Sequence, residues 1–525
     1  MSSSLNMNEK KHIDKLFCRG YLITANSDID LSTNGFLNDW RYLSIGKFNF
    51  YIHNKQNIYF KNRKGATVFL IGNCINPFTK QYREDEILED IVDNIENNFK
   101  SAINKINELT GSFLLGYIFN DTLEFLTDPT EMLFCTYGII NNNLYISSHY
   151  QLIGDLCSLE KDDYIKRLEK YKFFYKYGVF FPGDRTPFLS VKRSFTNHLY
   201  FYNDNDIHYE RFFPTENIID NHSEEEYYDT IKRIYNILQN TLICASQKWK
   251  KPAISLTGGV DSQTTLSASN GFRDKFFYYS YCSIKGDKID CDAAHEIANH
   301  IGIPHTIFNI STEDKDFEDI NTVRKIIEHN MGDYKCNKND VRKRVFFSTN
   351  ELFDVEIKSW VSEIGRANYY KKFGLKRMPS KLSPRNMTSM YKIFLTQRRL
   401  AKETDKIFEE FIKDSKFNEL PQGYDASDMY LWEFRYSAWG GIVITSEHSY
   451  SNEIFIPFNN RILLNLMLSV PKSKRISDEF HHDIIKYGDP KLSSLGITIT
   501  NWNETKTRQF FERLYFLFHS WIHKI

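Results

Sequence analysis

Residues 257–262 read TGGVDS and follow the apolar run PAISL, so two glycines, two hydroxyl residues and a carboxylate share one short loop. Backbone amides at a strand-to-helix turn bind anions, and a glycine lets the main chain approach a phosphate without a Cβ in the way. A carboxylate beside a polyphosphate is repelled unless a divalent cation lies between them, so Asp261 is predicted to bind Mg²⁺. The loop lacks the Gly-Lys-Ser/Thr ending of a Walker A motif. These residues therefore predict a site for ATP with Mg²⁺.

The segments around this loop alternate between strand and helix. Residues 252–256 are strand-like, a helix follows the loop, and 275–284 form a second strand-like run. A helix over 290–301, stopped by Gly302, and a strand over 305–310 complete a pattern typical of a parallel sheet. A glycine turn capped by Asp or Ser is common after any strand and is the alternative interpretation. The parallel-sheet surroundings favour the phosphate loop.

The first half of the chain has a different pattern. Short apolar runs alternate with turn residues over 20–76, a helical period covers 84–109, and four more strand-like runs follow. This order predicts an α+β domain of strands, helix and strands. A long amphipathic helix is expected over 223–248 with Ser223 as its N-cap, so the domain boundary is predicted near 215–222.

Composition narrows the class of protein. Lys plus Arg and Asp plus Glu both number 67, so the formal net charge is zero, which argues against a nucleic-acid or membrane-surface binder. The eight cysteines are scattered without a CxxC pair, which favours reduced thiols over zinc or disulfides. The N-terminus has no signal-peptide pattern, and the apolar run over 514–522 is too short to span a bilayer. We expect a cytoplasmic protein.

The loop resembles the Ser-Gly-Gly-x-Asp-Ser pyrophosphate loop of the N-type ATP pyrophosphatases, with Thr257 where that group has Ser. The likeness extends along nearly the whole chain to the asparagine synthetase family, which has a glutaminase-like domain followed by a synthetase domain. The segments that carry it are 108–138, 144–149, 185–202, 292–310 and 452–475. Their order and spacing together are specific.

The resemblance implies a fold and a set of binding residues. The first domain, over 1–215, would be a degenerate glutaminase-like (Ntn) αββα sandwich of the α+β class. The second, over 222–525, would be an α/β domain with a parallel sheet of the adenine nucleotide α-hydrolase-like (PP-loop) type and a helical C-terminal part. The nucleotide-binding residues implied are Leu256, Thr257, Gly258, Gly259, Asp261, Ser262, Ser283 and Ser362. ATP and Mg²⁺ are the implied cofactors, and the assembly could be a homodimer.

The N-terminus departs from the family. Glutamine-hydrolysing members begin Met-Cys, and the freed α-amino group activates that thiol. This chain has Ser2 instead, and its first cysteine, Cys18, is internal. Ser2 as an N-terminal nucleophile is one alternative. The simpler interpretation is that the glutaminase has been lost, as in the β-lactam synthetase and lasso peptide cyclase members of the family.

The second departure concerns the metal. The family's Gly-Glu-Gly-x-Asp-Glu loop has an aspartate that shares Mg²⁺ with the phosphate loop, and the matching stretch here is WVSEIGRANYY, 360–370. Glu363 stands for the first acid, and Arg366 falls where the metal aspartate is expected. The guanidinium could hold phosphate directly, metal binding could be lost, or the two residues could form a structural ion pair.

Two basic segments complete the expected site. Lys506 is the candidate for the family's catalytic lysine, with a solvated helix lysine as the alternative. Residues 371–377, KKFGLKR, are predicted to form a mobile basic loop at the mouth of the site. Glu363, Arg366 and Lys506 are therefore the candidate catalytic residues.

Three functions are compatible with this pattern. The first is an ATP-dependent ligase that activates a small-molecule or peptide carboxylate as an acyl-adenylate, releases pyrophosphate, and joins the acyl group to an amine or ammonia. The second is a non-catalytic nucleotide-binding or scaffold protein in a biosynthetic pathway. The third is a glutamine-hydrolysing asparagine synthase in the strict sense, which Ser2 argues against.

Overall fold

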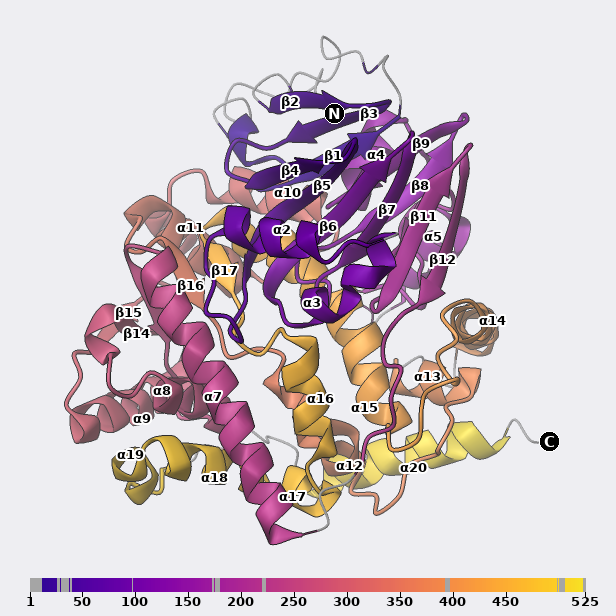
Figure 1. Cartoon of the computed structure of the whole chain (residues 1–525). Helices are drawn as coiled ribbons and strands as arrows, with labels where there is room; N and C mark the ends of the chain where they lie inside the picture. The colour runs from indigo at the N-terminus through magenta and orange to yellow at the C-terminus, as the bar shows by residue number, and fades with distance from the viewer. Residues whose placement is uncertain are drawn as a thin grey trace.

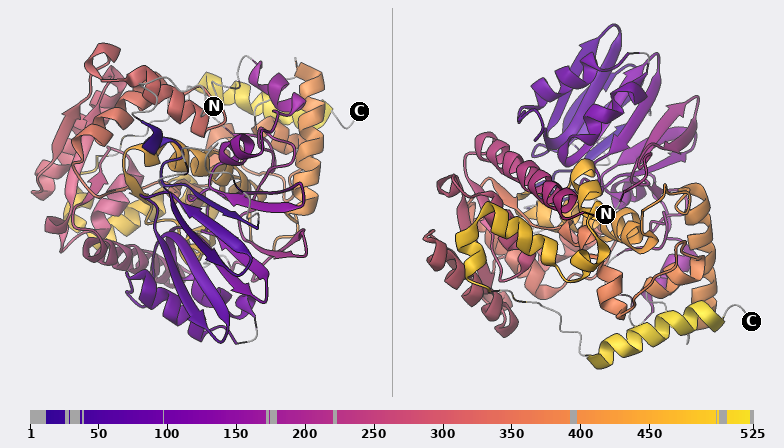
Figure 2. Two further views of the ribbon diagram at one scale, coloured as in Figure 1. Left: turned by 90° about the horizontal axis from the view of Figure 1, so that it is seen from above. Right: turned by 60° about the horizontal axis from the view of Figure 1, so that its bottom comes forward.

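The computed structural model has a half built from β-sheets, formed by the N-terminal residues, and a half of helices around another sheet (Figure 1). It describes residues 12–25, 29, 37, 40–96, 98–171, 174, 180–219, 223–391, 397–497, 499 and 506–522. Ser2, considered above as a nucleophile, lies outside the described residues. Figure 2 shows that the C-terminal helix lies on the side of the molecule away from the N-terminal sheets.

The N-terminal half consists of two six-stranded antiparallel sheets, with strand orders β10-β8-β9-β1-β3-β2 and β12-β11-β7-β6-β5-β4. The strands are β1 (Tyr21–Thr24), β2 (Arg41–Ile45), β3 (Phe48–Ile52), β4 (Ile58–Arg63), β5 (Ala66–Ile75), β6 (Thr110–Phe119), β7 (Thr122–Thr127), β8 (Thr136–Ile140), β9 (Asn143–Ser147), β10 (Lys192–Arg193), β11 (His198–Asn203) and β12 (Asp206–Arg211). Inward-facing side chains of both sheets, such as Phe50, Phe69 and Phe125, form one buried layer between them.

Helices cover the outer faces of this pair of sheets. The outer face of the second sheet packs against α2 (Glu84–Asp93), η3 (Phe99–Ala102) and α3 (Ile103–Asn107). On the first sheet, α4 (Tyr150–Leu156) follows β9 and is followed by α5 (Asp163–Glu169). The N-terminal half is thus the αββα sandwich expected for an Ntn-like domain.

The single helix expected over 84–109 is wrong, because α2, η3 and α3 are separate. Asn98 caps η3, its side chain accepting a hydrogen bond from the Ser101 amide, and Asn94 Nδ2 donates to the Asp90 carbonyl at 2.7 Å. Asparagine side chains compete in this way for backbone hydrogen bonds and end helices. The apolar period continued past these breaks because all three elements bury one face on the same sheet.

The long helix expected over 223–248 is confirmed as α7 (Glu224–Lys248). Ser223 and Glu226 form a reciprocal capping box at its start, and three glutamates lie in its first turn. This helix packs on α8 (Val260–Ala268) and α18 (Glu479–Gly488), so it supports the helix that begins at the TGGVDS loop.

The second half is built on a five-stranded parallel sheet with the order β15-β14-β13-β16-β17. The strands are β13 (Pro252–Ser255), β14 (Phe277–Cys282), β15 (Thr306–Asn309), β16 (Val355–Ile357) and β17 (Glu453–Phe455). After β13 the chain proceeds outward through β14 and β15, then returns to the other side of β13 for β16. The order therefore reverses between β13 and β16, and in parallel sheets ligands bind at such a point, beyond the carboxyl ends of the strands.

The rest of this half is helical. The further helices are α9 (Lys285–Ile301), α10 (Ile320–Asn330), α11 (Lys338–Asn350), η6 (Ser362–Arg366), α12 (Asn368–Phe373), α13 (Pro384–Met390), α14 (Arg398–Asp414), α15 (Ala426–Tyr430), η8 (Leu431–Gly440), η9 (Val443–Glu447), η10 (His448–Tyr450), α16 (Arg461–Ser469), α17 (Lys472–Ile476), α19 (Pro490–Ser494) and α20 (Lys506–Ile522). Gly302, with φ 79°, ends α9 as expected. None of the described helices has the length and apolarity needed to cross a membrane. The chain thus has the predicted fold class, an Ntn-like sandwich followed by a PP-loop-type parallel sheet with a helical C-terminal part.

The two halves are joined by contacts of two buried arginines. Arg193, which pairs with Glu131 of its own half at 2.7 Å, donates from Nη1 to Ser437 Oγ of the other half at 3.0 Å, and its side chain is only 2% exposed. Arg211 makes a two-pronged contact with Glu433, at 2.6 and 2.9 Å. Removing one partner of such a buried pair leaves an uncompensated charge, so these contacts fix how the halves dock.

Candidate functional site

The TGGVDS loop lies at the point where the strand order reverses. It leaves the carboxyl end of β13 and opens α8, while the neighbouring strand β16 is followed by residues 358–366. The two segments thus emerge side by side at the same edge of the sheet. The candidate site consists of these segments and of the helices that pack against them.

Hydroxyl groups hold the loop in shape. Ser262 Oγ donates toward the carbonyls of Thr257 and Gly259, at 2.9 and 3.0 Å, and Thr257 Oγ1 accepts from the Gly259 amide at 3.2 Å. Within the described part of the chain no side chain caps α8, so its first turn keeps backbone amides available for an anion. The Thr257 side chain is exposed at this end of the helix.

The two glycines of the loop do different things. A Cβ on Gly258 would lie 2.7 Å from Ile499 Cδ1 and 3.0 Å from Ala293 Cβ, so the chain packs tightly there. Among the described residues, a Cβ on Gly259 would meet only the Thr257 hydroxyl, at 3.3 Å. Gly258 therefore serves packing, and Gly259 leaves an open approach to the backbone.

Asp261, expected to bind Mg²⁺, is held by two protein side chains. Ser362 Oγ hydrogen-bonds to Asp261 Oδ1, and Arg366 Nη1 donates to Asp261 Oδ2 at 2.5 Å. Both partners come from η6, the turn that follows β16. Sequence reasoning placed Ser362 and Arg366 near the loop, and the structure brings them onto Asp261 itself.

The contact continues into a chain of four charged groups. Arg366 makes a two-pronged contact with Asp478, from Nε and Nη2, both at 2.8 Å, and Lys371 Nζ also reaches Asp478 Oδ1. Burial raises the pKa of Asp261, and the Arg366 guanidinium opposes that rise. Burial also acts to raise the pKa of Asp478, but Arg366 and Lys371 outweigh it and hold that pKa at about 2. Two cations and two carboxylates thus alternate along one line.

This arrangement does not fit a Mg²⁺ ion on Asp261. The carboxylate has one oxygen on Arg366 and the other on Ser362, and the guanidinium repels a second cation. Mg²⁺ requires a near-octahedral set of oxygen ligands. No group of three or more His, Cys, Asp or Glu side chains that could hold a metal occurs among the described residues. The metal assignment of Asp261 therefore stays a prediction, and these contacts argue against it.

Glu363 has a separate partner. Tyr436, in η8, donates its hydroxyl hydrogen to Glu363 Oε2. Burial and the nearby Asp261 carboxylate raise the pKa of Glu363 to about 7, while the Tyr436 hydrogen bond acts in the opposite direction. The structural ion pair between Glu363 and Arg366 considered above is not formed, since the guanidinium binds Asp261 and Asp478. A carboxyl group with this pKa can accept and return a proton near neutral pH.

His481, on α18, was not found from the sequence. Thr264 Oγ1 donates to the Val260 carbonyl at 2.9 Å and so accepts from His481 Nδ1, at 3.0 Å. His481 Nε2 is then a bare acceptor, 3.8 Å from Asp261 Oδ1 and without a hydrogen-bond partner in the described structure. Burial lowers the pKa of His481 far below its usual range, so the ring is neutral.

The remaining predicted residues lie at varying distances from this cluster. Leu256 is buried at the end of β13 and donates its amide to the Tyr279 carbonyl at 2.8 Å, which ties the loop to β14. Ser283 follows β14, and its hydroxyl donates to Asp287 Oδ2 at 2.7 Å. Lys506 is the exposed first residue of α20, and the described interactions give it no contact with Asp261, Glu363 or Arg366.

Part of the basic segment 371–377, expected as a mobile loop, is helical. Residues 368–373 form the helix α12, and Lys371 contacts Asp478, while 374–377 lie beyond the end of that helix. Gln509 of α20 donates to the Lys371 carbonyl at 2.7 Å, so the C-terminal helix holds α12 in place. Asp478 and Tyr436 carried no sequence signal of their own, because only the fold brings them to the loop.

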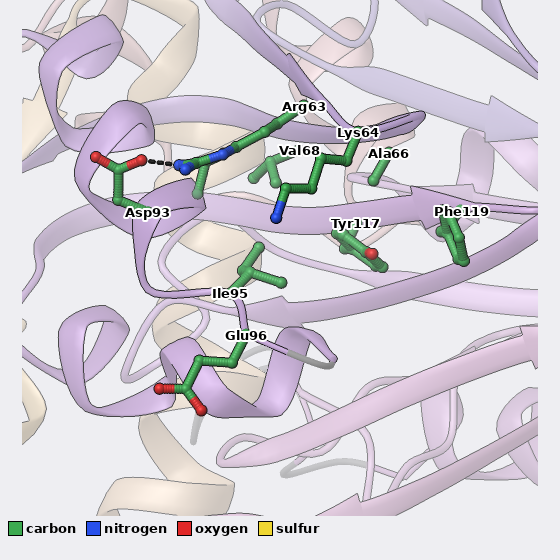
Figure 3. Close-up of a pocket in the computed structure, with 10 residues that line it drawn as sticks. Arg63, Lys64, Ala66, Val68, Asp93, Ile95, Glu96, Tyr117 and Phe119 are labelled. Carbon is green, nitrogen blue, oxygen red and sulfur yellow. Dashed lines mark ion pairs between the residues drawn. The ribbon is translucent and has the colours of Figure 1, made fainter.

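Two hollows found elsewhere do not include this loop. One, of about 400 Å³, lies in the N-terminal half between β4–β6 and the end of α2, lined by Lys64, Tyr117 and Phe119 and closed at one end by the Arg63–Asp93 ion pair (Figure 3). The other, of about 500 Å³, lies between the two halves near Glu453. We place the candidate site at the loop, because within the described parts of the chain an anion-binding backbone and a charge cluster meet there.

Comparison with known proteins gives only distant likenesses. No protein-family model and no curated protein matches the chain. A solved allosteric regulatory enzyme of purine biosynthesis is 13% identical over 52% of this chain and 61% of its own, with a TM-score of 0.25. The glutamine phosphoribosylpyrophosphate amidotransferase of B. subtilis is 9% identical over 76% of each chain, TM-score 0.25. The glutamine-dependent NAD⁺ synthetase of Acinetobacter baumannii is 12% identical over 40% of this chain and 43% of its own, TM-score 0.21.

Sequence identities and TM-scores this low carry no information on the activity of this chain. The chain spans less than two thirds of the length of the first of these structures. None of the three is an asparagine synthetase, so membership of that family stays a prediction from the sequence.

Proposed function

We propose that this protein is an ATP-dependent ligase that forms an amide. A carboxylate oxygen of the substrate attacks the α-phosphorus of ATP, pyrophosphate leaves, and an acyl-adenylate forms. An amine nitrogen then attacks the acyl carbon, AMP leaves, and the amine gives up a proton. The resemblance to the asparagine synthetase family supports this chemistry. The experiment below is designed to identify the substrate.

The observation that carries the proposal is the position of the TGGVDS loop. It joins the central strand β13 to α8 at the point where the strand order reverses, with the open backbone at Gly259 and the cations Arg366 and Lys371 beside it. Polyphosphate binding needs such a combination of backbone amides and cations. In this arrangement the residues present fit the nucleotide's phosphates.

Glu363 supplies the acid–base group. Its pKa of about 7 lets it take the proton that the attacking amine loses, and the Tyr436 hydroxyl orients its carboxylate. The nitrogen is proposed to come from an amine or from ammonia. Cys18 is buried and lies within the chain, so it has no α-amino group to activate it as a glutaminase nucleophile.

A non-catalytic nucleotide-binding role is the second candidate. The observation that favours it is the saturation of Asp261 by Arg366 and Ser362. A scaffold of this kind would bind ATP without consuming it. The two candidates therefore differ in pyrophosphate release and not in ATP binding.

The test is pyrophosphate release from ATP by the full chain, with a panel of amino acids and short peptides as carboxylates and hydroxylamine as the amine. The ligase should release pyrophosphate and form a hydroxamate with at least one carboxylate, and Gly259→Val should do neither. Glutamine supplied as the nitrogen source should yield no glutamate. ATP binding without pyrophosphate release across the panel would favour the scaffold instead.

A further inference from the structure

Arg366 lies at the edge of the parallel sheet and pairs with two carboxylates, those of Asp261 and Asp478. A guanidinium has five N–H donors, and three are used on Asp261 and Asp478, which leaves two in the described contacts. Its side chain is 12% exposed. Arg366 thus has donors to spare for a further ligand, in a place largely shielded from water.

The backbone that presents Arg366 is held in an unusual form. The residues on either side of η6, Val361 and Ala367, have φ values of 78° and 47°. Such a conformation is rare for a β-branched residue and costs free energy that the surrounding structure must supply. Val361 is fully buried, so the surroundings enforce it. The turn is therefore built to aim Ser362 and Arg366 at Asp261.

We propose that the Arg366 guanidinium takes the place of a divalent cation at Asp261, so that the loop binds a polyphosphate without a protein-held metal. That the ligand is a nucleotide polyphosphate rests on the proposed function, whereas the position of the guanidinium on Asp261 is independent of that function. A metal on Asp261 would have to displace a charge-assisted hydrogen bond of 2.5 Å and approach a fixed cation.

The residues around Arg366 support the proposal that this arginine takes the place of a metal ion. Lys371 brings a second cation to the same Asp478, so the cluster has two positive groups next to the α8 N-terminus. A guanidinium binds phosphate oxygens through two parallel N–H bonds and stays charged at every physiological pH. The N–H donors that Arg366 does not use on Asp261 and Asp478 are thus available to phosphate oxygens.

Direct metal binding tests this without any nucleotide. Mn²⁺ is titrated into the full chain, and the free ion is followed by electron paramagnetic resonance, for wild type and Asp261→Asn. We expect the two proteins to bind Mn²⁺ equally, with no site that depends on Asp261. One Mn²⁺ bound to wild type with a Kd below about 100 µM, and lost in Asp261→Asn, would overturn the proposal. The wild-type measurement does not depend on how well a variant folds.

A second measurement tests the anion. Inorganic tripolyphosphate is titrated calorimetrically in EDTA, and Arg366→Ala should bind it about tenfold or more weakly than wild type. Arg167→Ala is the matched control, because Arg167 forms an exposed ion pair with Glu403 away from the loop. Wild-type binding that requires Mg²⁺, or an Arg366→Ala variant that binds as tightly as wild type, would count against the assignment.

The two proposals fail in different ways. If ATP is never consumed but the Mn²⁺ and tripolyphosphate results are as expected, the ligase is wrong and the arginine assignment stands. If pyrophosphate is released only with a metal that Asp261 binds, the ligase stands and the arginine assignment is wrong.

Discussion

At the scale of single residues, the contrast between the two loop glycines gives a prediction about stability. Gly258→Ala should lower the free energy of unfolding by about 1–2 kcal/mol, because its Cβ would crowd Ile499 and Ala293. Gly259→Ala should leave it within about 0.5 kcal/mol, since only the Thr257 hydroxyl is near. Urea unfolding of both variants measures this, and equal losses would contradict the different roles of the two positions.

The pKa of Glu363 predicts how stability depends on pH. The folded pKa is raised, from 4.5 to about 7, so the stability that the protonated form contributes is complete below pH 4.5 and is lost as pH rises through 7. Glu363→Gln stays neutral and should avoid this loss, gaining on the order of 2 kcal/mol on wild type between pH 4.5 and 8. Unfolding at a series of pH values is the measurement. Parallel curves for the two proteins would show that Glu363 titrates normally.

The sequence revealed the local part of the site and missed the rest. The TGGVDS loop could be found because a phosphate loop is contiguous, and Arg366 could be placed near it from the resemblance of residues 360–370 to the family's metal-binding loop. Asp478 is the N-cap residue of α18 and His481 lies in its first turn, and nothing in the sequence shows that this helix packs on α8. The Mg²⁺ prediction on Asp261 stays a prediction, and the pairing of that carboxylate with Arg366, which the sequence did not reveal, argues against it.

At the scale of elements, the capping box at the start of α7 predicts how one substitution changes the stability of the protein. Ser223→Ala removes the side chain that accepts from the Glu226 amide, and should lower the free energy of unfolding by about 1 kcal/mol. Glu225→Ala is the control, because Glu225 is equally exposed in the same turn but does not belong to the capping box. Chemical denaturation of both variants decides it. A loss no larger than that of the control would mean that the cap contributes nothing.

Hydrophobic periodicity and capping residues predicted the helices and strands correctly where a single one of these signals dominated the local sequence. Alternating runs gave the strands of the first half, and Ser223 and Gly302 marked a helix start and a helix end. Prediction failed where side chains override periodicity, as at the asparagines near 94–98, and where tertiary contacts order a basic segment, as in α12. Lys371 was expected in a mobile loop, but its contacts with Asp478 and α20 hold it in α12.

At the scale of the whole molecule, His329 links the two halves and predicts a loss of stability at high pH. Burial alone would lower the pKa of His329, but its hydrogen bonds to Asp155 of α4 and to Asp333 raise that pKa from 6.5 to about 9. The stability it contributes is therefore complete below pH 6.5 and is lost as pH rises through 9. His329→Gln should cost about 3 kcal/mol at pH 6 and little at pH 10.

Thermal or urea unfolding between pH 6 and 10 measures this difference. His295→Gln is a suitable control, because His295 is exposed on α9 and contacts no residue of the N-terminal half in the described structure. If the cost of His329→Gln is the same at pH 6 and pH 10, the imidazolium does not hold the halves together.

The most direct measurement of the central claim is calorimetric titration of ATP into the full chain and into Gly259→Val. Valine at this open position blocks the approach of phosphate to the backbone while leaving Gly258, the packing glycine, in place. The account predicts one ATP site per chain in wild type and a loss of affinity of about a hundredfold or more in Gly259→Val, with an unchanged unfolding transition. Absence of ATP binding by wild type, or equal affinity in both proteins, would contradict it.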